Sequence, residues 1–117
     1  MIQVTPHMKI LLAVEPVDFR KGIDGLAMLC RTVLKTNPFS GAVFVFLNKA
    51  RTSIKILMYD GQGYWICQKR LSQGKFQSWV DKRKIHGHHK TLDAHELQML
   101  LWNGISNIAP MWKKISI

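Results

Sequence analysis

The chain has 117 residues, a length typical of one domain, and its 47% of hydrophobic residues argue against global disorder. Its 17 Lys and Arg residues against 7 Asp and Glu residues give a formal net charge of +10 at pH 7. No apolar run approaches the roughly 20 residues needed to cross a bilayer. We therefore expect a single domain over residues 1–117 that makes no membrane contact, and the two cysteines, expected to be reduced thiols, fit a cytoplasmic location. The charge suggests a polyanion as the partner, and a solvated surface or a protein partner is the alternative.

The first elements are a strand and a helix. Residues 9–14 (KILLAV) form a nearly continuous apolar run, which predicts a buried strand rather than a signal peptide. Asp18 is placed to cap a following helix, which we expect to end at Asn37-Pro38. The apolar residues of that helix recur at helical spacing and form one stripe: Ile23, Leu26, Ala27, Cys30, Val33 and Leu34.

The middle of the chain predicts an antiparallel meander. Three apolar runs, Ala42–Leu47, Ile54–Tyr59 and Tyr64–Leu71, are separated by a polar connection at residues 48–53 and by the turn Asp60-Gly61. Aromatic residues in a meander usually belong to the core, and we assign Trp65 there.

The last third predicts a loop, a helix and a tail. Residues 72–90 are expected to form a basic loop, and Asp93 with Glu96 resembles a capping box that opens a helix ending at Gly104. A tail over residues 106–117 either packs on the sheet or binds a partner. The predicted fold class is α+β, with a mostly antiparallel sheet of about four strands and one or two helices on one face.

The positive charge is concentrated late in the chain. Between Lys69 and Lys90 there are seven basic residues and one acid, Asp81, and such a block attracts phosphate backbones. Aromatic residues interleave with these cations and could stack bases. Arg20 and Lys21 form a second candidate site, because a helix N-terminus favours an anion; an ion pair with a nearby acid is the alternative. The candidate nucleic-acid-binding residues are Lys69, Arg70, Lys75, Lys82, Arg83, Lys84, Arg20 and Lys21.

Catalytic and metal sites are not indicated. The two cysteines, Cys30 and Cys67, are expected to be buried, reduced thiols. The acids have structural explanations as helix caps, turn residues or ion-pair partners, so no trio is left for a two-metal site. The histidines His86, His88 and His89 lack the spacing of a zinc site, and a solvated loop is favoured. We expect no enzyme activity, no cofactor, no metal and no small-molecule substrate.

Several blocks carry a family resemblance. They are PVDFRKGIDGL at Pro16–Leu26, PFSGAVFVF at Pro38–Phe46, IKILMYDGQGYWICQKRLSQGKF at Ile54–Phe76, and LDAHELQMLL at Leu92–Leu101. With these blocks the chain resembles the small accessory protein, of the Orf2 type, of the insertion-sequence-66 family of bacterial mobile elements. It departs from the family at Tyr59, where a Trp is usual, and at Trp79-Val80, where a Trp-Pro pair is usual.

The resemblance implies a part in transposition beside a separate, larger transposase. Together with the charge, it predicts a non-catalytic accessory factor that binds DNA or the transposase–DNA complex. The alternative is a protein–protein adaptor that binds the transposase through the sheet face or through the Trp102–Trp112 tail without contacting DNA.

Overall fold

The computed structural model describes residues 8–76 and 87–102. Within them lie five strands and two helices in the order β1-α1-β2-β3-β4-β5-α2. Their bounds are β1 Ile10–Ala13, α1 Ile23–Thr32, β2 Val43–Leu47, β3 Ser53–Tyr59, β4 Tyr64–Arg70, β5 His89–Leu92 and α2 Ala94–Trp102. No helix in the described part of the chain combines the length and the apolar character needed to span a bilayer.

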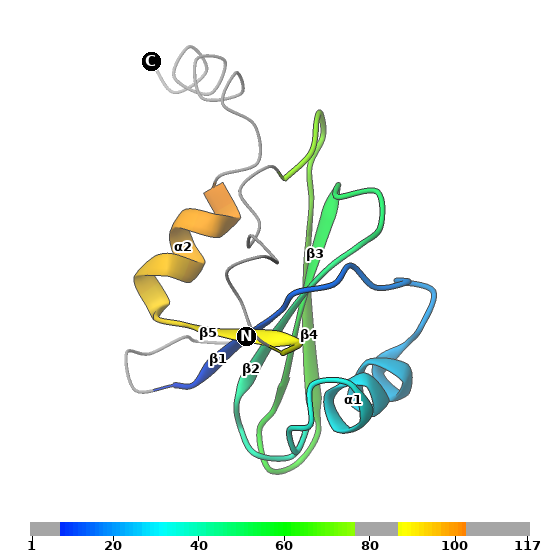
Figure 1. Ribbon diagram of the computed structural model, residues 1–117, viewed down its shortest axis with the longest axis vertical. Helices are drawn as coiled ribbons and strands as arrows, with labels where there is room; N and C mark the ends of the chain where they lie inside the picture. Colours follow the sequence, from blue (N-terminus) through cyan, green and yellow to red (C-terminus); the bar gives the residue numbers. More distant parts are fainter. Residues whose placement is uncertain (1–7, 77–86, 103–117) are drawn as a thin grey trace.

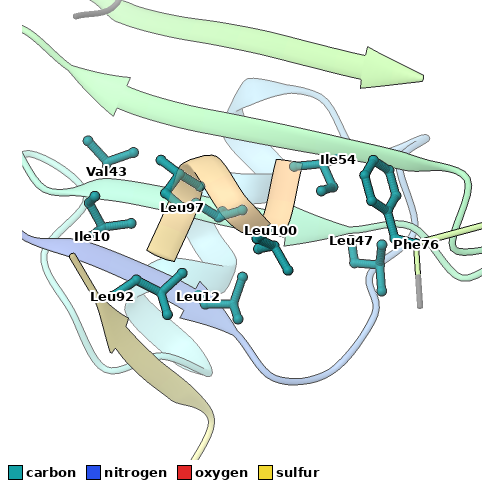
Figure 2. Packing of buried hydrophobic residues seen from close by; sticks show 10 residues of the cluster. Ile10, Leu12, Val43, Leu47, Ile54, Phe76, Leu92, Leu97 and Leu100 are labelled. Carbon is teal, nitrogen blue, oxygen red and sulfur yellow. The ribbon is translucent and has the colours of Figure 1, made fainter. Parts of the chain in front are cut away.

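The sheet is mixed, which refines the predicted topology. Its strand order is β4-β3-β2-β1-β5, and Figure 2 shows the five strands side by side. The strands β2, β3 and β4 form the expected antiparallel meander. Strand β1 is parallel to β2, because α1 carries the chain back across the sheet between them. The α+β class is confirmed, and the expected four mostly antiparallel strands become five with one parallel pair.

The fifth strand lies where the sequence predicted a loop. Residues 89–92 pair with β1 in antiparallel register, from Ala13↔His89 to Ile10↔Leu92. The end of the predicted basic loop at residues 72–90 is therefore wrong, since His89 and Lys90 belong to β5. A polar strand of four residues at the sheet edge gives little periodic signal, because only Leu92 is buried.

The two helices cover opposite faces of the sheet, and the prediction of helices on one face is wrong. Figure 1 shows α1 and α2 on either side of the strands. Alternate residues of β1 divide between the two cores: Leu11 packs with the helix α1, and Ile10 and Leu12 pack with α2. Figure 2 shows the α2 side, where Leu97 and Leu100 pack over the sheet.

Two helix starts test the predicted caps. In α2 the capping box is confirmed, because Glu96 N donates to Asp93 Oδ1 at 2.7 Å and Asp93 N donates to Glu96 Oε1 at 3.1 Å. In α1 the predicted cap is wrong: the N-cap is Gly22, which makes no side-chain hydrogen bond, and Asp18 binds elsewhere. The predicted stop at Gly104 and the tail at residues 106–117 lie outside the described residues.

Candidate nucleic-acid interface

Three connections meet at one end of the sheet. They are residues 14–21 between β1 and α1, residues 48–52 between β2 and β3, and residues 71–76 after β4. Backbone hydrogen bonds join them: Val17 N donates to Leu47 O at 2.8 Å, and Phe76 N donates to Arg51 O at 2.7 Å. We call these three connections, together with the strand residues Lys55 and Arg70, the basic end. Its cations are Arg20, Lys21, Lys49, Arg51, Lys55, Arg70 and Lys75.

The meander explains why these loops come together. Successive turns of an antiparallel meander alternate between the two ends of the sheet, so the β2–β3 turn lies beside the segment that leaves β4. In Figure 1 the turn after β4 is at the top of the view and the β3–β4 hairpin is at the bottom. The register sets Ser53 opposite Arg70 and places Leu71 N 2.9 Å from Thr52 O. The turn that carries Lys49 and Arg51 is thus joined to the end of β4 that carries Arg70.

Asn48 holds the turn that carries Lys49 and Arg51. Its Oδ1 accepts hydrogen bonds from Thr52 N at 2.8 Å and from Ser53 N at 3.1 Å, and its Nδ2 donates to Thr52 Oγ1 at 3.1 Å. Arg51 has a left-handed backbone with φ of 63°, an uncommon conformation for a residue with a side chain. The Asn48 bonds fix that turn, so its cations project from a defined backbone.

Arg20 is paired with Asp18, the alternative that the sequence left open. Arg20 Nη2 lies 2.8 Å from Asp18 Oδ2, and Asp18 Oδ1 also accepts from the Arg20 backbone N at 2.9 Å. These hydrogen bonds from Arg20 lower the pKa of Asp18 to about 2. The Arg20 side chain is 91% exposed, so it is accessible to an anion, but its charge is partly compensated by the carboxylate.

A hollow of about 410 Å³ lies beside this ion pair. It is bounded on one side by residues 17–20 and on the other by residues 48–50, so Arg20 and Lys49 share its rim. Lys55 links the same loop to the sheet, because its Nζ donates to Phe19 O at 3.2 Å and lies 5.0 Å from the centre of the Phe19 ring. One wall of the hollow is therefore attached to strand β3 through Lys55, and positively charged side chains lie at its rim.

Four exposed cations of the basic end form no ion pair with any acid in the described ranges 8–76 and 87–102: Lys21, Lys49, Arg70 and Lys75. Lys49 nevertheless lies close enough to Asp18 for its charge to contribute to the lowered pKa of that carboxyl. Arg51 differs from them, since it is half-buried and its Nε donates to Phe76 O at 3.2 Å. The positive charge available to a ligand at this end comes chiefly from Lys21, Lys49, Arg70 and Lys75, with that of Lys49 partly offset by Asp18.

Lys69 points away from this group. Adjacent residues of a strand face opposite sides of the sheet, and Lys69 lies on the α2 side. Its Nζ donates to Leu101 O at 2.6 Å and lies 4.7 Å from the centre of the Trp102 ring. Burial lowers the pKa of Lys69. A cation at the last turn of a helix stabilises the helix dipole, so these contacts give Lys69 a structural role at the end of α2.

The aromatic residues predicted to interleave with the cations do not lie exposed at the basic end, as far as the described residues show; the aromatic ring that contacts a cation there is that of Phe19, beside Lys55. Tyr64 and Trp65 begin β4, whereas Arg70 ends it, and six residues of a strand span roughly 20 Å. Phe76 is fully buried. The assignment of Trp65 to the core is wrong: its side chain is 40% exposed, and its Nε1 donates to Asp60 Oδ2 at 2.7 Å. Trp79 lies outside the described residues.

The remaining predicted cations divide into two groups. Lys21 is exposed directly before α1, close to Arg20. Lys82, Arg83 and Lys84 lie outside the described residues, as does His86. The sequence reasoning missed Lys49, Arg51 and Lys55. The sequence did contain the information needed to place these three cations. A predicted meander brings the loop at residues 48–53 to the same end of the sheet as the segment after β4.

The acids and thiols occupy structural positions. Asp60 accepts from Gln62 N and Gly63 N at 2.9 Å in the β3–β4 turn, and these bonds lower its pKa. No group of three or more His, Cys, Asp or Glu residues that could hold a metal ion occurs within residues 8–76 and 87–102. Both cysteines are free, as expected. Cys30 is buried, which raises its pKa to about 12, but Cys67 is only partly buried, contrary to prediction.

Comparisons with known proteins agree with the resemblance read from the sequence blocks. The family model described as IS66 Orf2-like protein matches residues 8–110. An uncharacterized protein of Sinorhizobium fredii, y4jC, is 37% identical over 76 residues, which are 65% of each chain. A second uncharacterized protein of that organism, y4hO, is 36% identical over 70 residues, 60% of this chain and 61% of its own.

The chain thus spans slightly less than two thirds of the length of these curated relatives. No solved structure matches it. The family match covers most of the chain, including every described strand and helix. The chain therefore belongs to the family of IS66 Orf2-like proteins.

Proposed function

We propose that this protein is a non-catalytic accessory factor for transposition of a bacterial insertion sequence and that it binds DNA through the basic end. The family ties the chain to the insertion sequence IS66. The observation that supports DNA as the ligand is the convergence of Lys49, Arg70 and Lys75 at one end of the sheet, where none of them forms an ion pair with an acid of the described residues. The separate transposase of the element is the protein beside which it acts.

The chemistry of the basic end favours contacts to phosphates over contacts to bases. Its cations lie on loops and at a strand end, and no exposed aromatic side chain of the described residues lies among them. Lysine and arginine bind phosphate oxygens without reading sequence, whereas specificity requires side chains that reach base edges in a groove. The proposed binding is therefore electrostatic, tolerant of sequence and weakened by salt.

Charge reversal at two places tests this proposal. The double variant Arg70→Glu/Lys75→Glu removes two uncompensated cations of the basic end. The control Lys9→Glu/Lys35→Glu makes the same change in net charge with exposed lysines at the other end of the sheet. Binding to a fluorescent duplex, measured by anisotropy at about 50 mM salt, should weaken by about 100-fold in the first variant and by less than tenfold in the control. Equal losses would mean that only net charge matters, and the proposed site would be wrong.

One observation favours a second candidate function, the adaptor that binds the transposase without DNA. The side chains of Met99 and Trp102 on α2 are 59% and 70% exposed, which is unusual for large apolar residues. The faces of the sheet are covered by α1 and α2, so an adaptor would use this helix rather than the sheet.

Pull-down of the element's transposase separates the two functions. An adaptor that uses the apolar surface of α2 should retain the transposase in the variant Arg70→Glu/Lys75→Glu and lose it in Met99→Glu. A DNA-bridged complex should show the reverse pattern and should dissociate when nuclease is added. Circular dichroism of each variant checks that the fold is intact.

A further inference from the structure

Strand β4 has one edge that no strand of the described residues pairs with. All seven of its residues pair with β3 on one side, from Tyr59↔Tyr64 to Ser53↔Arg70. It is the last strand in the sheet order, and no described strand pairs with its other side; Figure 2 shows it at the border of the sheet. The strand contains no proline and its register has no bulge. A long, regular free edge is a template for pairing with another strand.

The register shows which backbone groups face outward. Leu71 N donates to Thr52 O at 2.9 Å, and Asp60 N donates to Gly63 O at 3.0 Å. Odd-numbered residues of β4 therefore bond to β3, and because the pattern alternates, even-numbered residues direct their N–H and C=O groups to the free edge. These residues are Tyr64, Ile66, Gln68 and Arg70.

We propose that β4 of a second copy of this chain pairs with this edge in antiparallel register, with the two-fold axis at Cys67. In that register the even-numbered residues meet each other, so Tyr64 bonds to Arg70 of the partner subunit and Ile66 bonds to Gln68 of the partner subunit. All seven residues of each strand are paired, and the outward backbone groups of the four even-numbered residues find partners. The two sheets become one continuous ten-stranded sheet.

The side chains favour this register over its alternatives. Across the axis Tyr64 lies opposite the exposed Arg70 of the partner subunit. Trp65 lies opposite Lys69 of the partner subunit, whose Nζ is already bound to Leu101 O and lies over the Trp102 ring, so Arg70 is the cation available for a cross-strand pair. A cation beside an aromatic side chain is a favourable cross-strand pair. A parallel arrangement would instead bring the Lys69–Arg70 ends of both strands together, and like charges across a ladder repel. The aromatic residues at one end of β4 and the cations at the other are thus self-complementary.

The proposed two-fold axis places two Cys67 thiols close together, so a disulfide cross-link can test the register. Cys67 lies opposite Cys67 of the partner subunit in a pair that is not hydrogen-bonded, where Cα atoms are about 4.5 Å apart. That spacing falls within the range of about 4.4–6.8 Å compatible with a disulfide. Cys67 is a free and partly exposed thiol, whereas Cys30 is buried.

Cross-linking in the absence of DNA tests the register. Copper(II) phenanthroline accepts one electron from each of two Cys67 thiolates, the thiol protons pass to the buffer, and one sulfur–sulfur bond forms. We expect a covalent dimer on non-reducing gels for the native chain and for Cys30→Ser, and none for Cys67→Ser. The variant Cys67→Ser/Gln68→Cys moves the thiol by one residue. Its Cα atoms would then be about 8 Å apart, beyond disulfide reach, and cross-linking should be lost.

Sedimentation equilibrium provides a second test that needs no thiol. Proline at Gln68 removes an N–H that faces the free edge and leaves the bonds to β3 in place, a position where sheets tolerate proline. Two lost hydrogen bonds per dimer should weaken self-association by about 30-fold in Gln68→Pro. The matched variant Gln68→Ala keeps the N–H and should behave as the native chain.

The proposal is overturned if the native chain sediments as a monomer at 100 µM (the highest concentration to be tested). It is also overturned if Gln68→Cys cross-links as well as Cys67, because the register would then be wrong. Neither measurement involves nucleic acid, so their outcome is independent of the proposed DNA binding.

Discussion

The two ends of the sheet differ in how their side chains are arranged: cations are exposed at one end, and aromatic rings pack together at the other. At the basic end, Lys49, Arg70 and Lys75 are exposed and form no ion pair with an acid of the described residues. At the other end, which we call the aromatic end, Phe39, Tyr59 and Tyr64 contact one another with ring centres 4.8–5.8 Å apart. One of the cations at this end, Arg31, lies 5.1 Å from the centre of the Phe39 ring.

This difference shows how topology separates residues that the sequence mixes. Strand β4 begins with Tyr64 and Trp65 and ends with Lys69 and Arg70. Because the strand runs the full length of the sheet, its aromatic residues and its cations are delivered to opposite ends. At the aromatic end the rings pack on one another, although the buried Tyr64 hydroxyl has no hydrogen-bond partner among the described residues. The basic end gathers more exposed cations than the aromatic end and is therefore better suited to a negatively charged ligand.

The substitution Asn48→Ala should have the largest effect on stability of the changes that follow. It removes the side chain that binds Thr52 and Ser53 in the turn of the basic end. Leaving half-buried N–H groups without acceptors should reduce the free energy of unfolding by about 2 kcal/mol. Urea denaturation followed by circular dichroism measures this loss. A change within error would show that the turn does not depend on Asn48.

The substitution Phe39→Ala tests the aromatic end. It removes ring contacts with Tyr59 and Tyr64 and the site over which Arg31 lies. Since Phe39 is 48% exposed, we expect a loss of only about 1 kcal/mol in the free energy of unfolding. Affinity for DNA should be unchanged. A large loss of DNA binding in this variant would mean that the aromatic end, and not the basic end alone, meets the ligand.

The substitution Asp18→Asn should strengthen DNA binding. It removes the carboxylate that compensates Arg20 and adds one effective positive charge to the basic end. We expect an increase in affinity of about three- to fivefold at low salt, because one more cation can contact phosphate. Anisotropy titration measures the gain, and Asp24→Asn, an equal charge change in the first turn of α1, is the control. Unchanged or weaker binding would show that Arg20 lies outside the interface.

The pH dependence of the Asp18–Arg20 pair is the smallest expected effect. Hydrogen bonds from Arg20 lower the pKa of Asp18 from 3.8 to about 2 in the folded protein. A carboxyl whose pKa is depressed by folding contributes stability above the unfolded value and loses it as pH falls through the folded value. The contribution should therefore be present above pH 4 and disappear between pH 4 and pH 2. NMR titration of the Asp18 carboxyl should show a higher pKa in Arg20→Ala that stays below 3.8, because the backbone N–H of residue 20 and the charge of Lys49 remain. The same low pKa there would exclude the Arg20 side chain as its main cause.

The sequence predicted the local elements better than their arrangement. The strands of the meander and the capping box of Asp93 and Glu96 were predicted because period-two patterns, turn residues and caps are local signals. Strand β5 was missed because it is short, polar and paired with β1, far away in the sequence. The placement of helices on both faces had an unused signal: β1 and β2 are apolar without alternation, which is typical of strands covered on both sides.

The candidate site was predicted only in part for the same reason. A charge count along the chain finds Arg70 and Lys75 but treats Lys69 as their equal, although its side chain points to the end of α2. It also passes over Lys49, which reaches the basic end through the fold rather than through its sequence neighbours. The number of cations in a segment can be counted from the sequence, whereas the fold decides which of those cations lie on one surface.

The salt dependence of DNA binding tests the central claim most directly. A basic end that contacts phosphates through Lys49, Arg70 and Lys75 should give a slope of about −3 in a plot of log Kobs against log salt concentration, since each contact releases about one counterion. The slope should shrink to about −1 in Arg70→Ala/Lys75→Ala and stay near −3 in Lys9→Ala/Lys35→Ala. A native affinity that does not change with salt, or a slope that falls equally in both double variants, would contradict the account.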